Sequence, residues 1–330
     1  MARIIDVARE AGVSRTTVSR YINKNIELPT ATGARIDAAI KRLNYRPNLL
    51  AKSLSTGRSD LIGVVAPDIS KPFFGTLISA IEDEAEKHGY SVLVSNSRGL
   101  RSKEVELITR LEDRHVDGLI LMTNKSDDDG ALATFLAKYD NVMLLDEDVS
   151  GFVGPKVFVE NEQGAWLATQ YLIEAGHRNI AHIGGPEGLM STKERLLGFT
   201  RAMCENGLAT DRVLLGDHTR EFGVAATEQL LNDSDMPTAI FAGSDFLALG
   251  VMQKVRERGL RVPQDISLLG FDDMPFAELL APPLTTIRQP DQELGHRAFF
   301  ALLGAINNQP PTTERLPTSL VERQSVARLT

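Results

Sequence analysis

The sequence predicts two kinds of fold in one chain: a small all-α helix-turn-helix head, and behind it an α/β body with two lobes of doubly wound parallel sheet. Three observations predict this arrangement. Short amphipathic segments separated by a glycine fill the first 46 residues. From Leu61 onward, apolar β-branched runs alternate with amphipathic stretches. The length of 330 residues is more than one ordinary domain needs.

Charge separates the head from the body. Residues 1–58 carry eleven Lys and Arg against four Asp and Glu, a net +7, whereas residues 59–330 carry 25 against 40, a net −15. A basic head can release counterions from phosphates, and an acidic body discourages contact with the same polyanion. Charge therefore favours nucleic-acid binding by the head, although a solvated face on which charges merely cluster would give the same count.

The composition is that of a protein that stays in water. No apolar run approaches the roughly 18 to 20 residues that a membrane span needs. The start, MARIIDVAREAG, mixes acids and bases where a secretion signal would be continuously apolar. We therefore expect a cytoplasmic protein with no membrane partner. The single cysteine, Cys204, lies on a helical pattern, and we expect it to be packed and inert.

Three helices are predicted in the head. Residues 4–11 place apolar side chains on one helical face, and Gly12 ends that helix. Ser14 is the expected N-cap of a second helix over residues 15–23. A third amphipathic segment, residues 32–43, closes a core that neither short helix could bury alone. Two short helices joined through a glycine are typical of a helix-turn-helix.

The exposed face of the second helix suits a major groove. Arginine reads guanine with two hydrogen bonds, and a threonine methyl can touch thymine, so we expect base contacts from Arg15, Thr16 and Arg20. Arginines on a short helix are also often only solvated, which is the alternative interpretation. Short polar side chains suit phosphate oxygens. The residues expected at phosphates are Ser14, Ser19, Asn23, Tyr45 and Asn48.

The body alternates strands and helices. The expected strands are LIGVVA, SVLVS, DGLILM, VMLL, IAHIG, VLLG, AIFAG, ISLLG and TTIR. The expected helices lie near residues 73–88, 103–114, 130–139, 163–175, 193–205, 223–231 and 246–258. Buried apolar strands that alternate with helices predict parallel sheets, and roughly ten such units fit two lobes better than one sheet.

Ligands of open α/β sheets bind beyond the carboxyl ends of the strands. Polar or aromatic residues follow most of the expected strands here, namely Phe73, Phe74, Asp146, Asp217, His218, Ser244, Asp245, Asp272, Asp273 and Gln289. Carboxylates that accept hydroxyls, together with aromatic rings, indicate a site for a sugar-like ligand. For Asp245 the role of helix N-cap is the favoured interpretation.

Two long stretches resemble a known family. The run IIDVAREAGVSRTTVSRYIN, followed by TGARIDAAIKRLNYRPNLLAKSLSTGRS, is similar to the head of the lactose-repressor/galactose-repressor (LacI/GalR) family. The resemblance implies that Arg15, Thr16 and Arg20 read bases, and that residues 47–56 form a hinge helix on the operator. Leu54 would then wedge into the minor groove, as apolar side chains do in other DNA-bending proteins. Arg3 and Gly33 depart from the family pattern, which usually has a capping threonine and an arginine there.

The body resembles the periplasmic-binding-protein-like effector domain of the same family, most clearly in HRNIAHIGGP, RLLGF, PTAIFAGSDFLALG and VPQDISLLGFDD. The resemblance implies a small-molecule effector between the lobes and no cofactor or metal. The implied lining residues are Phe73, Phe74, Asp146, Ser191, Arg195, His218, Ser244, Asp272 and Gln289, with Arg195 and Asp272 the best candidates for direct contacts. His218 and Leu189 replace an aromatic residue and an arginine of relatives, which disfavours the ligand of the purine-responsive relative.

The resemblance also implies domain bounds and assembly. The expected domains are residues 1–46 for the helix-turn-helix, 47–60 for the hinge helix and linker, and 61–330 for effector binding and dimerisation, with an N-lobe of about 61–160 plus 291–319 and a C-lobe of about 161–290 plus 320–330. Two heads that meet a near-palindromic operator imply a homodimer. The implied function is that of a transcription regulator, in most members a repressor, whose grip on double-stranded DNA depends on the effector.

An enzyme and a transport receptor are two alternative classes of function for this sequence. Doubly wound folds host many enzymes, but the sequence has no phosphate loop, dinucleotide fingerprint, GxSxG elbow or histidine spacing typical of a metal site. A transport receptor with the same body would need a secretion signal and would have no use for a basic helix-turn-helix. The sequence therefore predicts a protein that is not an enzyme.

Overall fold

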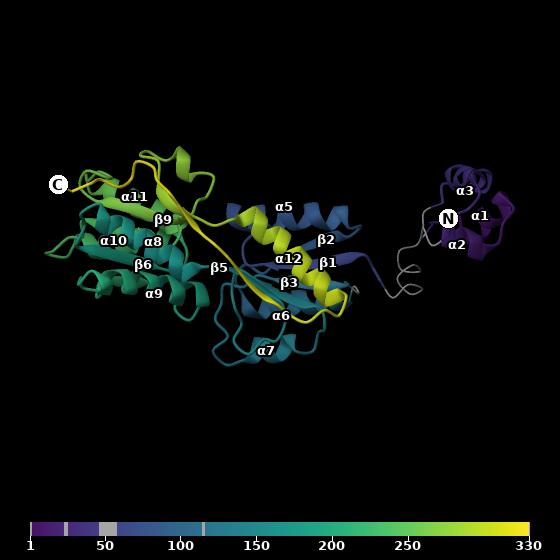
Figure 1. The fold of residues 1–330 in the computed structure, drawn as a ribbon, viewed down its shortest axis with the longest axis horizontal. Coiled ribbons are helices and arrows are strands. Elements are labelled where there is room, and N and C mark those ends of the chain that lie inside the picture. The colour runs from purple at the N-terminus through teal and green to yellow at the C-terminus, as the bar shows by residue number, and fades with distance from the viewer. Residues whose placement is uncertain (1, 23–25, 46–57, 114–115, 330) are drawn as a thin grey trace. The chain divides into compact units, whose positions relative to one another are not determined.

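The computed structural model describes residues 2–22, 26–45, 58–113 and 116–329, and the chain divides into two compact units, residues 1–59 and 60–330. The first unit contains three helices, α1 (Ile4–Ala11), α2 (Arg15–Ile22) and α3 (Thr30–Leu43) (Figure 1). Their apolar faces form one small core of Val7, Ala8, Ala11, Val18, Ile36 and Ala39. Gly12 ends α1 in the left-handed conformation, with φ at 66°, which glycine adopts without strain. The expected helix-turn-helix is confirmed.

The two residues that depart from the family pattern both fit this unit. Arg3 has no side-chain acceptor for a cap, but its backbone N–H donates to the Asp6 carboxylate over 2.8 Å. Gly33 is buried on α3, where a Cβ atom would lie 2.9 Å from the hydroxyl of Tyr21. That hydroxyl donates to Asp37 over 2.9 Å, so the glycine makes room for a contact between α2 and α3.

The second unit is built on two six-stranded sheets. The first has the order β11-β5-β4-β3-β1-β2 and the second the order β12-β10-β9-β8-β6-β7. Every pairing is parallel except that of β10 with β12. The strands of the first sheet are β1 (Leu61–Ala66), β2 (Ser91–Asn96), β3 (Gly118–Leu121), β4 (Val142–Leu145), β5 (Lys156–Val159) and β11 (Thr313–Leu316). Those of the second are β6 (Ile180–Gly184), β7 (Val213–Leu215), β8 (Ala239–Ala242), β9 (Ser267–Asp272), β10 (Thr285–Arg288) and β12 (Ser319–Val321).

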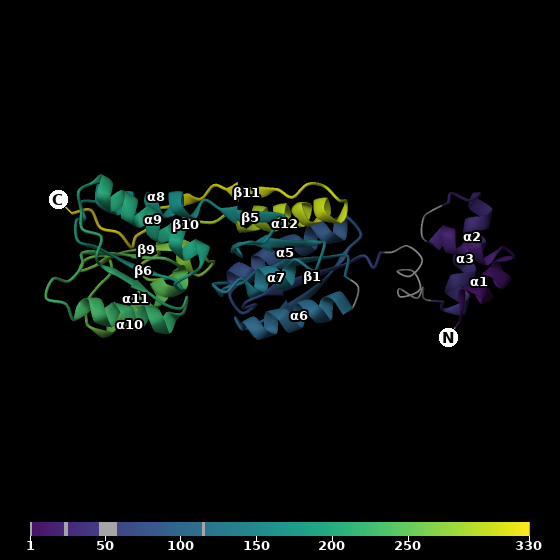
Figure 2. The same cartoon turned by 90° about the horizontal axis from the view of Figure 1, so that it is seen from below.

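Helices cover both faces of each sheet. On the first sheet, α5 (Pro72–Lys87) and α12 (Asp291–Ile306) cover one face, and α6 (Arg101–Asp113) and α7 (Ala131–Leu136) the other (Figure 2). On the second sheet, α10 (Arg220–Leu231) and α11 (Asp245–Glu257) lie opposite α8 (Asn161–Glu174) and α9 (Met190–Glu205). A short 3-10 turn, η1 (Ala277–Leu279), follows β9. The predicted α/β class with parallel sheets in two lobes is thus confirmed.

Most expected elements occur, with helix bounds within three residues of those predicted. Five were not predicted: β5, η1, α12, β11 and β12. The strands among them are only three or four residues long. One smaller expectation is wrong, because the Cys204 side chain is exposed rather than packed.

The chain passes between the sheets three times: after β5, after β10, and between β11 and β12. Figure 1 shows these segments side by side between the two halves of the unit. Because all strands except β12 run parallel within their sheet, the carboxyl ends of these strands share one edge of the sheet. The residues that follow β1, β3 and β4 line the same cavity as those that follow β7, β8 and β10. The fold therefore brings the carboxyl edges of both sheets to one site.

Candidate functional sites

The first candidate site is the outer face of α2. Arg15, Thr16 and Arg20 are exposed, while Val18 on the opposite face is fully buried in the helical core. Neither arginine forms an ion pair with another described residue. The burial of one apolar face thus turns the predicted base-reading side chains outward together, as a helix that enters a major groove requires.

The predicted phosphate contacts fall into three groups. Ser14 caps α2, since its hydroxyl accepts the backbone N–H of Thr17 over 3.0 Å, which confirms the predicted N-cap. Ser19 is half-buried, and Tyr45 packs against the small helical core. The other predicted DNA contacts, Asn23, Asn48 and the wedge Leu54, lie outside the described residues, as does most of the predicted hinge segment.

The second candidate site is a cavity in the second unit, between the two sheets. It contains about 590 Å³ of space between atoms, including the open space at its mouth. All nine residues that the sequence predicted for an effector site line it: Phe73, Phe74, Asp146, Ser191, Arg195, His218, Ser244, Asp272 and Gln289. The structure brings this set together from both sheets. Whether the set binds an effector stays a prediction.

Arg195 is the main cation of the cavity. It lies on α9, and its side chain is buried, with 5% of the residue exposed. Its guanidinium group donates to the Asn161 side chain over 2.9 Å and to the Gly243 carbonyl over 2.6 Å. The group also stacks on the Phe271 ring, with the Cζ atom 3.8 Å from the ring centroid. These contacts fix the guanidinium before any ligand arrives.

Asp272 ends β9 beside this arginine. One carboxylate oxygen lies 3.9 Å from Arg195 Nη1 and accepts a 2.7 Å hydrogen bond from Gln289. Burial raises the pKa of Asp272 to about 6, against the opposing effect of Arg195. The φ angle of Asp272 is 118°, which is strained for a residue with a side chain, and such strain clusters at functional sites.

Asp146 follows β4 and lines the same cavity. Burial raises its pKa to about 7, while Arg195 lowers it and Glu147 raises it. His218 is affected in the opposite sense, since burial lowers its pKa to about 3, with Arg195 and Lys71 acting in the same direction. The imidazole of His218 is therefore neutral at physiological pH. The carboxyl group of Asp146 gains or loses its proton near physiological pH.

Several polar atoms at the cavity have no partner within the described chain. They are Asn124 Oδ1, Gln289 Oε1 and His218 Nδ1. Buried polar atoms are normally hydrogen-bonded, so unpartnered ones at a cavity indicate where a ligand or water binds. Two of these three are oxygens that can only accept, which suits a molecule rich in hydroxyl or N–H donors.

Two predicted lining residues already have structural partners. The Ser191 hydroxyl donates to Glu147 over 2.6 Å. The Ser244 hydroxyl caps α11 by accepting the Leu247 backbone N–H over 3.3 Å. The interpretation of Asp245 as the N-cap is therefore wrong. Asp245 is the first residue of α11, and its carboxylate accepts from Thr286 and from the backbone of Met274.

Sequence reasoning missed several lining residues: Lys71, Thr123, Asn124, Glu147, Phe246 and Met274. Lys71 gave no signal, because loop lysines are usually exposed. Its ammonium group donates to the His218 carbonyl over 2.8 Å and lies 5.3 Å from the Phe246 ring centroid. Thr123 and Asn124 could have been found, since they follow an expected strand as the other candidates do.

Two other kinds of site are absent from the described part of the chain. No group of three or more His, Cys, Asp or Glu lies close enough there to hold a metal ion. No described helix is both long and apolar enough to cross a membrane.

Both units of the chain are similar to known proteins. Residues 3–48 match the model for bacterial regulatory proteins of the lacI family, and residues 169–326 match that for a periplasmic binding protein-like domain. The chain is 34% identical, over the full length of both proteins, to the transcriptional repressor PurR of Vibrio atlanticus. It is similar to the lac repressor dimer bound to operator and the anti-inducer ONPF, with 33% identity, a TM-score of 0.89 and 99% of each chain covered.

A further solved structure is the complex of the transcriptional regulator CelR with cellobiose, at 31% identity and a TM-score of 0.75, covering 98% of this chain and all of that one. The identity of 34% to PurR over the full length of both chains shows the family of this protein. The chain belongs to the lacI family of bacterial regulatory proteins, whose members are DNA-binding transcription regulators.

Proposed function

We propose that this chain is a sequence-specific repressor whose affinity for an operator is controlled by a small polar ligand, a sugar or sugar derivative, bound between the two lobes. The observation that carries the proposal is the cavity in the second unit, where nine predicted residues from two sheets meet. A ligand that prefers one arrangement of the lobes shifts the population that can hold DNA, typically by about 1–3 kcal/mol.

The proposal gives each DNA-facing residue a role. Arg15, Thr16 and Arg20 contact bases, and Leu54 wedges into the minor groove. Phosphates are contacted by Ser14, Ser19, Asn23, Tyr45 and Asn48. In the cavity, Phe73, Phe74, Asp146, Ser191, Arg195, His218, Ser244, Asp272 and Gln289 bind the effector, and no cofactor or metal takes part.

A sugar-like effector is supported by the chemistry of the cavity. Unpartnered oxygens of Asn124 and Gln289 need donors, and sugar hydroxyls supply them. Phe73 and Phe74 offer apolar ring surface beside these acceptors. One similar regulator is known as a complex with cellobiose.

The proposal includes the assembly and its domains. Two copies form a homodimer, because two heads match a pseudo-palindromic operator. The N-lobe comprises about 61–160 plus 291–319 and the C-lobe about 161–290 plus 320–330, with residues 47–60 as hinge and linker. The sheet memberships described above support these bounds. A regulator of this kind works in the bacterial cytoplasm, on the nucleoid when it is bound to DNA.

The test is selection of DNA from a random pool by the full chain at fixed salt, with and without a panel of sugars, sugar acids and purines. We expect a palindrome whose affinity shifts with one member of the panel. Binding that follows only salt, with no selected sequence, would refute sequence-specific regulation. A selected palindrome that no sugar affects, but a purine does, would refute the sugar class alone.

A further inference from the structure

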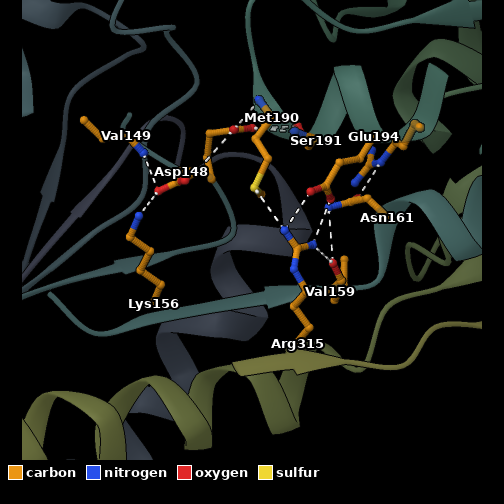
Figure 3. Close-up of polar contacts among 11 residues, drawn as sticks. Asp148, Val149, Lys156, Val159, Asn161, Met190, Ser191, Glu194 and Arg315 are labelled. Atoms are coloured by element: carbon orange, nitrogen blue, oxygen red, sulfur yellow. Dashed lines mark hydrogen bonds and ion pairs between the residues drawn. The ribbon is translucent and has the colours of Figure 1, made fainter. Parts of the chain in front are cut away.

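The two halves of the second unit are joined by a group of side chains beside the effector cavity (Figure 3). Glu147 follows β4 of the first sheet, and α9, which packs on the second sheet, begins at Met190. One Glu147 oxygen accepts the Met190 backbone N–H over 2.6 Å, and the other accepts the Ser191 hydroxyl over 2.6 Å and its N–H over 3.3 Å. A carboxylate from one half thus caps a helix of the other.

This cap is buried and has several donors. Only 2% of Glu147 is exposed, and the Asp148 backbone N–H donates to it as well, over 3.2 Å. The 16-residue helix α9 contributes its free N–H groups and the positive end of its dipole. Charge-assisted hydrogen bonds are among the strongest polar contacts in a protein.

A second contact joins the same two elements. Arg315 lies on β11 of the first sheet, and its guanidinium group donates to both carboxylate oxygens of Glu194 on α9, over 2.7 and 2.9 Å. It also donates to the carbonyl of Val159 over 3.2 Å, and the Met190 sulfur lies 3.7 Å from it. Figure 3 shows the guanidinium group of Arg315 with its contacts to Glu194, Val159 and Met190. Arg315 and Glu147 therefore both bind the first turns of α9.

We propose that Glu147, Ser191, Glu194 and Arg315 form a latch that holds the lobes closed with no effector bound, and that an effector which hydrogen-bonds Ser191 must displace the Glu147 carboxylate. The latch rests on the proposed function, because it regulates the same cavity. It makes closure a property of the empty protein. The effector then competes with an internal carboxylate for the first turn of α9.

The test measures the distance between the lobes. Cys204, the sole cysteine, is exposed on α9, and Val153, with 88% exposed, lies between β4 and β5. A Val153→Cys variant of the full chain therefore carries one spin label on each half. Dilution with unlabelled chain limits a dimer to one labelled copy. Pulsed electron paramagnetic resonance then gives the distribution of lobe distances without DNA or effector.

Three substitutions are compared in this background. Glu147→Gln keeps the size of the side chain but removes the charge, and we expect it to raise the ratio of open to closed lobes about tenfold or more. Glu194→Gln weakens the contact with Arg315 and is expected to act in the same direction, which guards against misfolding of the first variant. Asp148→Asn is the matched control, because Asp148 pairs with Lys156 of its own sheet over 2.6 Å.

The latch is supported if both glutamate variants open the lobes and Asp148→Asn does not. It is refuted if neither glutamate variant changes the distances, or if Asp148→Asn changes them as much. The DNA selection described above is run separately. Lobe distances that respond in a chain that selects no operator would remove the proposed function and leave the latch standing. A chain that selects an operator but whose lobe distances do not respond to the glutamate variants would keep the proposed function and lose the latch.

Discussion

At the residue scale, the cavity holds charges that burial disfavours. Asp146 and Asp272 both have raised pKa values, and the left-handed φ of Asp146, 73°, adds strain to the same place. Residues held in this way cost stability and persist where function requires them. This cost in stability is measurable, because a substitution that removes the buried charge should stabilise the protein without effector.

Asp146→Asn is expected to stabilise the body above neutral pH. The pKa of Asp146 is about 7 in the folded chain and about 3.8 unfolded, so folding binds a proton between these values and stability falls as pH rises through them. Asparagine cannot ionise and tolerates the left-handed backbone. We expect Tm at pH 8 to rise by about 2–4 °C for each kcal/mol recovered, and the gain to vanish below about pH 4.

Solvent in the cavity screens part of this effect, so the pH dependence of the gain is the decisive readout. Thermal melting of the body at pH 4, 6 and 8 measures it. Asp211→Asn, at an exposed position, controls for the loss of one negative charge. A gain that is the same at all three pH values would show that the Asp146 carboxyl is not the cause.

Arg20 allows a test of base reading by a single side chain. Arg20→Ala is expected to cost about 1–3 kcal/mol of operator affinity and to relax selectivity at one base position. Arg20→Lys keeps the charge but loses the two-pronged geometry that reads guanine, so it should retain the salt dependence and lose the selectivity. Operator selection with each variant measures the affinity for the operator and the selectivity at that base position. Unchanged selectivity in Arg20→Ala would remove Arg20 from base reading.

At the scale of elements, glycines set how closely the helices of the body pack. A Cβ atom on Gly250 in α11 would lie 2.2 Å from the carbonyl oxygen of Arg220, at the start of α10. Gly75 in α5 is exposed, and a Cβ atom placed on it would have no atom of another segment within 4 Å. Both are glycines inside a helix, where alanine has the higher propensity.

The two glycines should therefore respond oppositely to the same change. Gly75→Ala is expected to raise the free energy of unfolding by about 0.5–1 kcal/mol through propensity alone. Gly250→Ala must push α10 and α11 apart, and we expect a net loss of about 1–3 kcal/mol. Chemical denaturation of both variants, followed by circular dichroism, measures these changes. Stabilisation by Gly250→Ala would mean that the two helices can separate without loss of packing.

The same scale shows what the sequence could predict. Strands such as LIGVVA are continuous apolar runs and were predicted, whereas TERL in β11 lies at a sheet edge and has three polar residues and one buried leucine. The α12 segment carries apolar residues at helical spacing, Leu294, Ala298 and Leu302, so the same periodicity rule could have predicted it. The N-cap of α11 went to Ser244 rather than Asp245, since both residue types cap helices and the sequence does not rank them.

The candidate site was predictable to a different degree. The nine lining residues follow strands or belong to family motifs, so their meeting at one cavity could be expected. Glu147 also follows an expected strand, but its contact with Ser191 across the cavity could not be predicted, and neither could the position of Lys71 beside His218. Contacts between segments far apart in sequence depend on the relation of the two sheets, which periodicity does not encode.

At the scale of the whole molecule, regulation is a coupling between the effector cavity and the operator. The coupling is reciprocal by linkage: if an effector weakens operator binding by a given factor, the operator weakens effector binding by the same factor. For couplings of about 1–3 kcal/mol the factor is about 5 to 150. The latch and the hinge would then be two elements biased by the same lobe equilibrium.

This reciprocity is the last prediction. With the operator and effector identified by selection, calorimetric titration gives the effector Kd of the free and operator-bound protein, and fluorescence anisotropy gives the operator Kd with and without effector. We expect the two ratios to agree within experimental error at one salt concentration, because both report one lobe equilibrium. Ratios that differ would require a further state, such as a dimer that binds one effector. An effector for which both ratios equal one would not be a regulator, however tightly it binds. Equal affinity for both lobe arrangements does not shift the equilibrium between them.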